Sequence, residues 1–196
     1  MMAPADDGTD GRPPILRHKD HQAPSVFTPD ALLREARRQK GIGAGTVPEI
    51  CILDPDGDMV RHLLATERAR RVPLWACYHT DLHVFEHEGL SYGIIGCAVG
   101  AAFAVLVAEE LFASGCKLLI GMTSAGQILP VQTPPYFIII DRALRDEGTS
   151  YHYLPPACAL QVWFGTKSSI SLMPRFASFS RNCANAVSLP SASRTV

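Results

Sequence analysis

Between Glu88 and Glu109 the chain has 20 consecutive uncharged residues, which is long enough to cross a lipid bilayer. The stretch changes character midway. Residues 91–99 combine β-branched side chains with glycine, whereas residues 101–114 are rich in alanine and end before Gly115. This change predicts a strand, a tight turn and a buried helix. Acidic residues at the boundaries, in place of basic and aromatic anchors, also argue against a membrane span.

The charge balance excludes two classes of partner. The 196 residues contain 18 Lys and Arg against 19 Asp and Glu, for a net charge of −1. A dedicated nucleic-acid binder or a protein of anionic membranes carries a basic surface, so we expect neither partner. The first residues are acidic and no apolar segment follows them, which is unlike a secretory signal, and we therefore expect a cytoplasmic protein.

The cysteines do not follow a disulfide or zinc pattern. Cys51, Cys77, Cys97 and Cys116 lie in or beside apolar runs, and no CxxC pair occurs. We expect reduced, buried thiols.

Apolar strands alternate with helical segments along most of the chain. Thr28, Pro29 and Gly41 carry the start and stop signals of a helix. The pattern then predicts, in order, a strand at 50–54, helical spacing in 59–71, strands in 74–99 broken near Glu88, a helix at about 100–114, and strands at 116–122 and 135–144. Such units predict a three-layer α/β/α fold around a mainly parallel sheet.

The composition divides the chain into three parts. Residues 1–27 are poor in large apolar side chains and are expected to be disordered. Residues 28–156 carry the α/β pattern. No acidic residue follows Glu147 over the last 49 residues, and residues 157–196 are expected to be an atypical, weakly structured tail.

Three turns follow strands of the predicted sheet: Asp54–Asp58, Val99–Ala102 and Thr123–Gln127. Open α/β sheets bind ligands at the carboxyl ends of their strands, and glycine in such turns lets the backbone approach an anion. A glycine that merely permits a tight turn is the alternative, and none of the turns is a dinucleotide or P-loop motif.

Four segments in order carry a family resemblance: ICILDPDGDMVRHL, GCAVGAAFAVLVAEEL, KLLIGMTSAGQI and FIIIDRALRDEGTSYHYLPP. Together, over about Val47 to Pro156, they resemble the nucleoside phosphorylase family of uridine and purine nucleoside phosphorylases. The resemblance implies a pentosyltransferase that cleaves the N-glycosidic bond of (deoxy)ribonucleosides, with inorganic phosphate as co-substrate and no other cofactor. It also implies a homo-oligomer.

The resemblance assigns the candidate phosphate- and substrate-binding residues. Ser124 matches the hydroxyl residue that contacts phosphate, and Thr123 and Gly126 shape the same turn. Gly100 and Ala101 match the glycine-rich strand end below the sugar and phosphate.

The chain departs from the family at its cations. The family's three phosphate-binding arginines fall on Met59, Gly121 and about Tyr78, and Asp54 adds a negative charge. The acidic residues that hold ribose and base lie past the Tyr-His-Tyr segment in the family, where this chain has none. We therefore expect a fold that is incomplete or altered at its C-terminal end.

These departures leave three functions open. One is phosphorolysis, another is hydrolysis of nucleosides by a protein of the same superfamily, and the third is an inactive binding or assembly subunit. Glu147, Ser150 and His152, in a polar loop after a predicted strand, are further candidate pocket residues.

His79, His83 and His87 have a spacing that places them on one face of a helix or a strand, where they could bind zinc. Histidines on a solvent-facing hairpin are the more common outcome, and we predict no metal site.

Overall fold

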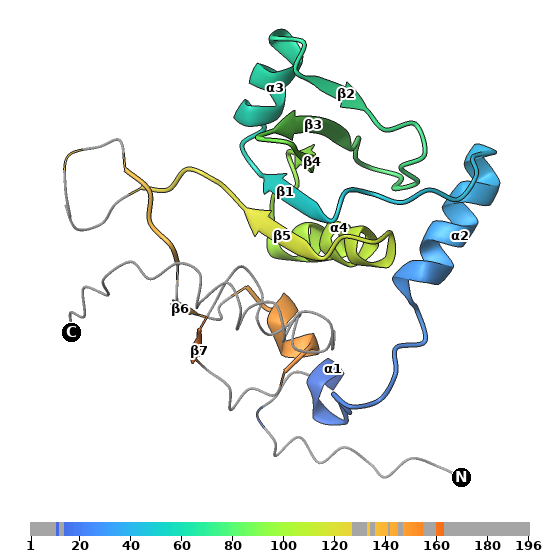
Figure 1. The fold of residues 1–196 in the computed structure, drawn as a ribbon. Helices are drawn as coiled ribbons and strands as arrows, with labels where there is room; N and C mark the ends of the chain where they lie inside the picture. The colour runs from blue at the N-terminus through green and yellow to red at the C-terminus, as the bar shows by residue number, and fades with distance from the viewer. Residues whose placement is uncertain are drawn as a thin grey trace.

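The computed structural model describes residue 11 and residues 14–126, 133, 136–140, 142–144, 147–154 and 160–162. Its helical elements are α1 (Pro14–Arg17), α2 (Pro29–Lys40), α3 (Asp58–Ala65), α4 (Ala101–Ala113) and the 3-10 helix η1 (Thr149–His152). Its strands are β1 (Ile50–Asp54), β2 (Ala69–Arg71), β3 (His83–His87), β4 (Leu90–Gly96), β5 (Leu118–Gly121), β6 (Arg142–Leu144) and β7 (Leu160–Val162). The strand order of the main sheet is β2-β3-β4-β1-β5 (Figure 1).

Helix α2 confirms the capping signals in the sequence. The Thr28 hydroxyl accepts a hydrogen bond from the Ala31 amide at 3.3 Å, and Gly41 ends the helix with a φ of 64°. A left-handed residue at this position is favourable for glycine because it has no side chain to clash.

Helix α3 is shorter than its sequence pattern predicts. The apolar spacing indicates helix through residue 71, but α3 ends at Ala65 and residues 69–71 form β2. Glu67 adopts a φ of 56°, and the Arg68 amide donates to the Leu63 carbonyl at 2.8 Å. This Schellman-type ending closes the helix and turns the chain toward the sheet.

The prediction of a mainly parallel sheet is only partly correct. Strand β1 pairs in parallel with β4 and β5, as expected for strand–helix–strand units. Strands β2, β3 and β4 pair antiparallel, and the two-residue turn Glu88-Gly89 joins β3 to β4 as a hairpin. Both turn residues have positive φ, which matches the twist of a hairpin.

The long uncharged stretch folds as predicted. It contributes strand β4, a turn and helix α4, not one continuous helix. Among the described residues, no helix has the length and apolar character needed to cross a membrane.

Helices cover both faces of the sheet, which confirms the three-layer α/β/α arrangement (Figure 1). On one face Ile52 and Ile94 pack against Val60 and Leu63 of α3. On the other, apolar residues of β1 and β4 pack against Val107 and Leu111 of α4. Helix α2 forms an outer layer on α4.

The predicted strand at 135–144 is largely wrong. Of its described residues, only Arg142–Leu144 form a strand, and this strand pairs with β7 outside the main sheet. Residues 137–140 are apolar and exposed, and no strand of the described residues pairs with them. An apolar run favours a strand, but a strand forms only where another one pairs with it.

The structure describes only part of the two segments, 1–27 and 157–196, that flank the predicted α/β domain. Helix α1 lies in the first segment, and β7 lies in the last. His21 Nε2 lies 3.0 Å from the Tyr151 carbonyl oxygen, a contact between the N-terminal segment and η1. The remainder of 157–196 lies outside the described residues.

The cysteine prediction holds for three positions and fails at one. Cys51, Cys77 and Cys116 are buried free thiols, whereas Cys97 is exposed. Cys97 has a φ of 63° in the turn after β4, and the next residue, Ala98, is buried in the core.

The core on α4 gives a test of the fold. Replacing the fully buried Leu111 with alanine removes a side chain that packs on the sheet. We expect the free energy of unfolding, measured by urea denaturation, to fall by about 2–5 kcal/mol. Leu64→Ala is the control, because Leu64 is 42% exposed on α3. Equal effects of the two variants would contradict the assigned core.

Candidate functional site

The carboxyl ends of three parallel strands meet at one edge of the sheet. In the strand register, Asp54 of β1 lies opposite Gly96 of β4, and Leu53 lies opposite Gly121 of β5. The loops that follow these strands therefore start side by side, as the sequence predicts. We call the residues 54–58, 97–100 and 121–126 the strand-end loops.

A buried carboxylate fixes the first of these loops. Asp54 is 2% exposed, and its Oδ1 and Oδ2 accept hydrogen bonds from the amides of Gly57 at 3.1 Å and Val60 at 3.0 Å. Val60 lies in the first turn of α3, where free amides need acceptors. Asp54 therefore has a structural task and is not free to contact a substrate.

The same residue joins the first loop to the second. The Asp54 carbonyl accepts a hydrogen bond from the Cys97 amide at 3.0 Å. A Cβ added to Gly57, whose φ is 73°, would lie 2.7 Å from Cys97 Sγ. Glycine is required here both by its conformation and by this close approach.

The third loop contacts the first through Asp56. The Asp56 Oδ2 accepts a hydrogen bond from the Ser124 amide at 2.6 Å and another from the Thr123 hydroxyl at 3.2 Å. The hydrogen bond from the Ser124 amide is the main cause that lowers the pKa of the Asp56 carboxyl below its usual value. The group is thus a carboxylate at neutral pH.

The strand-end loops are acidic. They contain Asp54, Asp56 and Asp58 and no lysine, arginine or histidine. The nearest basic residue along the chain, Arg61, forms an ion pair with Asp58 and donates to the Asp56 carbonyl at 3.1 Å. Met59, at a position where the family has an arginine, packs against the core on the α3 face.

The start of α4 lies at the same edge. Gly100, with a φ of 91°, precedes the helix, and no side chain caps it. Ala101 is the first helical residue. Free amides at a helix start favour negatively polarised groups of a ligand. The structure thus brings Gly100 and Ala101 to the edge where Thr123 and Ser124 also lie. Gly126 follows in the same loop, where an added Cβ would meet nothing within 4 Å.

His79 lies beside the same helix. Its ring centroid is 6.3 Å from that of Phe103, two residues after Ala101. Sequence reasoning considers this histidine only as a metal ligand. The sequence could have placed His79 at this edge. In a hairpin the first strand begins near the end of the second, so the loop before β3 lies near the carboxyl end of β4.

The predicted pocket residues Glu147, Ser150 and His152 lie in or before η1. Glu147 Oε2 accepts a hydrogen bond from the Ser150 amide at 3.1 Å, which caps this short helix. The neighbouring Tyr153 donates its hydroxyl to Glu109 Oε1 at 2.7 Å. This contact places η1 along the second half of α4, away from the helix start.

The histidines of the hairpin do not converge. His83 is half-buried on β3, and His87 is exposed near the turn. Across the described residues, no three histidine, cysteine or acidic side chains come together as a metal site.

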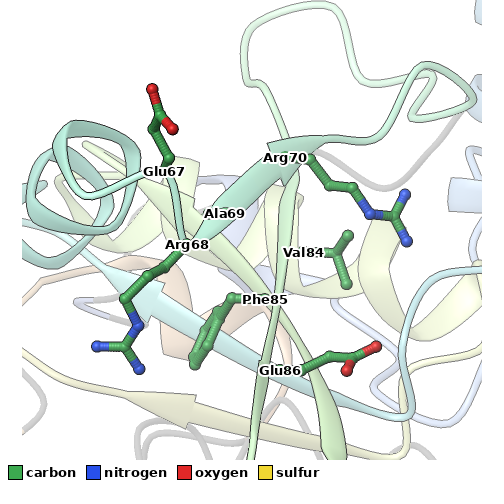
Figure 2. A pocket seen from close by; sticks show the side chains of 7 residues that line it. All are labelled: Glu67, Arg68, Ala69, Arg70, Val84, Phe85 and Glu86. Atoms are coloured by element: carbon green, nitrogen blue, oxygen red, sulfur yellow. The ribbon is translucent and has the colours of Figure 1, made fainter.

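A shallow hollow of about 310 Å³ lies elsewhere, over β2 and β3 (Figure 2). The guanidinium groups of Arg68 and Arg70 diverge at its rim, so they do not converge on one anion (Figure 2). We place the candidate site at the strand-end loops.

A curated protein is similar in sequence to this chain over half of its length. A curated uridine phosphorylase of Thermococcus kodakarensis is 29% identical over 109 residues, which cover 50% of this chain and 39% of the relative. The aligned region therefore spans about two fifths of that enzyme's length. No protein-family profile matches the chain.

Solved structures agree with this likeness in fold. Uridine phosphorylase from Vibrio fischeri, complexed with 6-hydroxy-1-naphthoic acid, matches with a TM-score of 0.51 and 20% identity, over 62% of this chain and 53% of that chain. A second structure of the Vibrio fischeri enzyme gives 0.50 and 23%, over 60% and 49%. The chain shares their α/β fold over about half of their length.

The role of Asp54 can be tested by Asp54→Asn. An asparagine side chain has one acceptor oxygen, so either the Val60 amide loses its partner or the Gly57 amide keeps only the Asp54 carbonyl. We expect a loss of about 1–3 kcal/mol in the free energy of unfolding, measured by urea denaturation. Asp58→Asn removes the same charge from an exposed pair and should change stability by less than about 1 kcal/mol. Equal losses would show that Asp54 is not a structural cap.

Proposed function

We propose that this chain, a homologue of uridine phosphorylase that belongs with the nucleoside phosphorylases, binds a nucleoside at its strand-end loops and cleaves the N-glycosidic bond of a (deoxy)ribonucleoside. The observation that supports this most is the meeting of three loops and the start of α4 at one edge. Edges of this kind are the usual ligand sites of open α/β sheets.

The electrostatics of the edge fit the chemistry. Cleavage of an N-glycosidic bond passes through a transition state with positive charge on the sugar. Asp56 and Asp58 are exposed carboxylates in loops without basic residues, so the local potential is negative. Such a potential stabilises a developing cation more than it stabilises the neutral substrate.

The proposal gives each candidate site residue a position relative to the substrate. Gly100 and Ala101 lie below the sugar, and Thr123, Ser124 and Gly126 form the turn that faces the acceptor. Glu147, Ser150 and His152 remain candidates for the outer pocket. The protein would work in the cytoplasm as a homo-oligomer, as a pentosyltransferase when phosphate is the acceptor.

A specific observation favours a second candidate, hydrolysis. In the resemblance, Ser124 matches the hydroxyl residue that contacts phosphate, and here the amide of this residue donates to the Asp56 carboxylate. Met59 and Gly121 stand where the family has phosphate-binding arginines, which also favours hydrolysis. Water would then be the acceptor in place of phosphate.

A nucleoside panel tests the function. We expect purified protein to release free base from at least one ribonucleoside, measured by chromatography with and without phosphate. Release that needs phosphate supports phosphorolysis, and release without it supports hydrolysis. No release from any nucleoside would contradict the proposal and leave an inactive binding or assembly subunit.

Where release depends on phosphate, Ser124→Ala should lower the rate by at least about tenfold, because one hydroxyl contact to a charged group is lost. Ser91→Ala is the matched control, since Ser91 lies on β4 at the opposite edge of the sheet. An unchanged rate in Ser124→Ala would remove this hydroxyl from the site.

His79 supplies the proton donor that the departing base needs. It is exposed beside the start of α4, and a histidine ring can act as a general acid toward a departing base. We expect His79→Gln to lower the rate of base release by about 100-fold. His87→Gln, at the hairpin turn, should leave the rate unchanged. Equal rates in the two variants would contradict this role.

A further inference from the structure

The loop of residues 75–80 carries His79 and lies along helix α4. In this loop the Cys77 thiol lies beside the carboxyl group of Glu110, and the His79 ring lies beside Phe103, with ring centroids 6.3 Å apart. Phe103 and Glu110 are seven positions apart in α4, so they project from the same face of the helix, two turns from each other. The loop therefore follows this face from the second half of α4 toward its start, where the candidate site lies.

Glu110 holds the loop from the side of α4. The residue is 1% exposed, and the Cys77 thiol donates a hydrogen bond to its carboxyl group. Burial is the main cause that raises the pKa of the Cys77 thiol, so this thiol stays protonated and keeps the hydrogen that it donates. An apolar side chain would fill this place in the core at a lower cost, so the hydrogen bond to Cys77 is what Glu110 contributes.

Lys40 holds the same residue from the side of α2. Its Nζ donates a hydrogen bond to the Cys77 carbonyl oxygen and lies 5.6 Å from the centroid of the Tyr78 ring, within reach of a cation–π contact. Lys40 is the last residue of α2, and α2 packs on α4. One helix therefore holds the side chain of Cys77, and the other holds its backbone.

The two ends of the loop are joined by a further contact. Trp75 is 6% exposed, and its Nε1 donates to the Thr80 hydroxyl at 2.9 Å. His79 lies between these anchors and is itself exposed. Its position beside the start of α4 is therefore set by the anchored residues around it, and above all by Cys77.

We propose that Glu110 and Lys40 are positioning residues that hold Cys77 from two helices and thereby place the His79 ring at the start of α4. The placement stands on the contacts described above. Its consequence for catalysis rests on the proposed function, in which His79 gives a proton to the departing base. A displacement of about 1 Å at a reacting group can lower a rate by about 100-fold, so both residues can affect the rate without contact to the substrate.

NMR spectroscopy of the His79 ring tests the placement without reference to activity. The full chain is labelled with ¹³C and ¹⁵N, and the ring proton signals of His79 are measured. The neighbouring Phe103 ring shifts these signals by its ring current, and Phe103→Leu gives their positions without it. Signals that move toward those of Phe103→Leu therefore report that His79 has left its place.

Two variants of Glu110 separate its contact from its charge. Glu110→Leu removes the acceptor and keeps a buried side chain of similar size, whereas Glu110→Gln keeps an acceptor oxygen without the charge. Glu109→Gln is the matched control, because Glu109 is the neighbouring carboxylate of α4 and accepts from Tyr153.

Lys40→Met removes the second anchor. Lys40 is exposed, so this variant leaves the core intact and tests the placement even where Glu110→Leu does not fold. Lys117→Met is its control, because Lys117 is an exposed lysine that pairs with Glu49.

We expect the His79 signals of Glu110→Gln and of both controls to match those of the wild type. In Glu110→Leu and Lys40→Met they should move toward the positions seen in Phe103→Leu, and amide exchange in residues 77–80 should rise by at least about tenfold. Unchanged signals in either folded variant would overturn the role of that residue. Equal displacement in Glu110→Gln and Glu110→Leu would also overturn the proposal, because the acceptor would then not matter.

Kinetics separate the placement from the proposed function. Where base is released, Glu110→Leu should lower kcat by at least about tenfold with little change in KM, and Glu110→Gln should restore it. If His79 is displaced and even the wild type releases no base, the placement stands and the enzymatic proposal fails. If base is released at the same rate with His79 displaced, the consequence for catalysis is overturned.

Discussion

The buried carboxylate of Asp54 is the interaction on which the carboxyl edge depends. This carboxylate accepts hydrogen bonds from the amides of Gly57 and Val60, and the backbone carbonyl of Asp54 accepts one from the Cys97 amide. One residue therefore connects β1 to the start of α3 and to the loop after β4. A buried charge is stable only when its hydrogen-bonding capacity is used, and here the backbone uses it. The position of the remaining loops follows from this arrangement.

Two aspartates, two residues apart, thereby acquire different tasks. Asp54 faces inward and satisfies amides of its own loop and helix, whereas Asp56 faces outward and satisfies donors of the loop after β5. The outward contact joins loops that are 68 positions apart in the sequence. This contact holds the loop after β5 against the loop after β1, at an edge that carries acidic side chains.

Local signals predict the elements well where the cause is local. Thr28 and Gly41 bound α2, the change of composition after Gly96 separates β4 from α4, and Glu88-Gly89 forms the hairpin turn. They fail where the outcome depends on a partner. Residues 137–140 are as apolar as a strand, yet no strand in the described part of the chain pairs with them, and Glu67 ends α3 by a conformation that its residue type does not favour.

The sequence alone determined the alternation of strands and helices, the meeting of three loops at one edge and the resemblance to nucleoside phosphorylases, because periodicity, glycine and short motifs are local properties. Only the tertiary structure decided the mixed pairing of the sheet, the place of η1 along α4 and the contact between Asp56 and the Thr123–Ser124 turn. These depend on the direction in which side chains from distant segments point, and that direction is set when the segments pack.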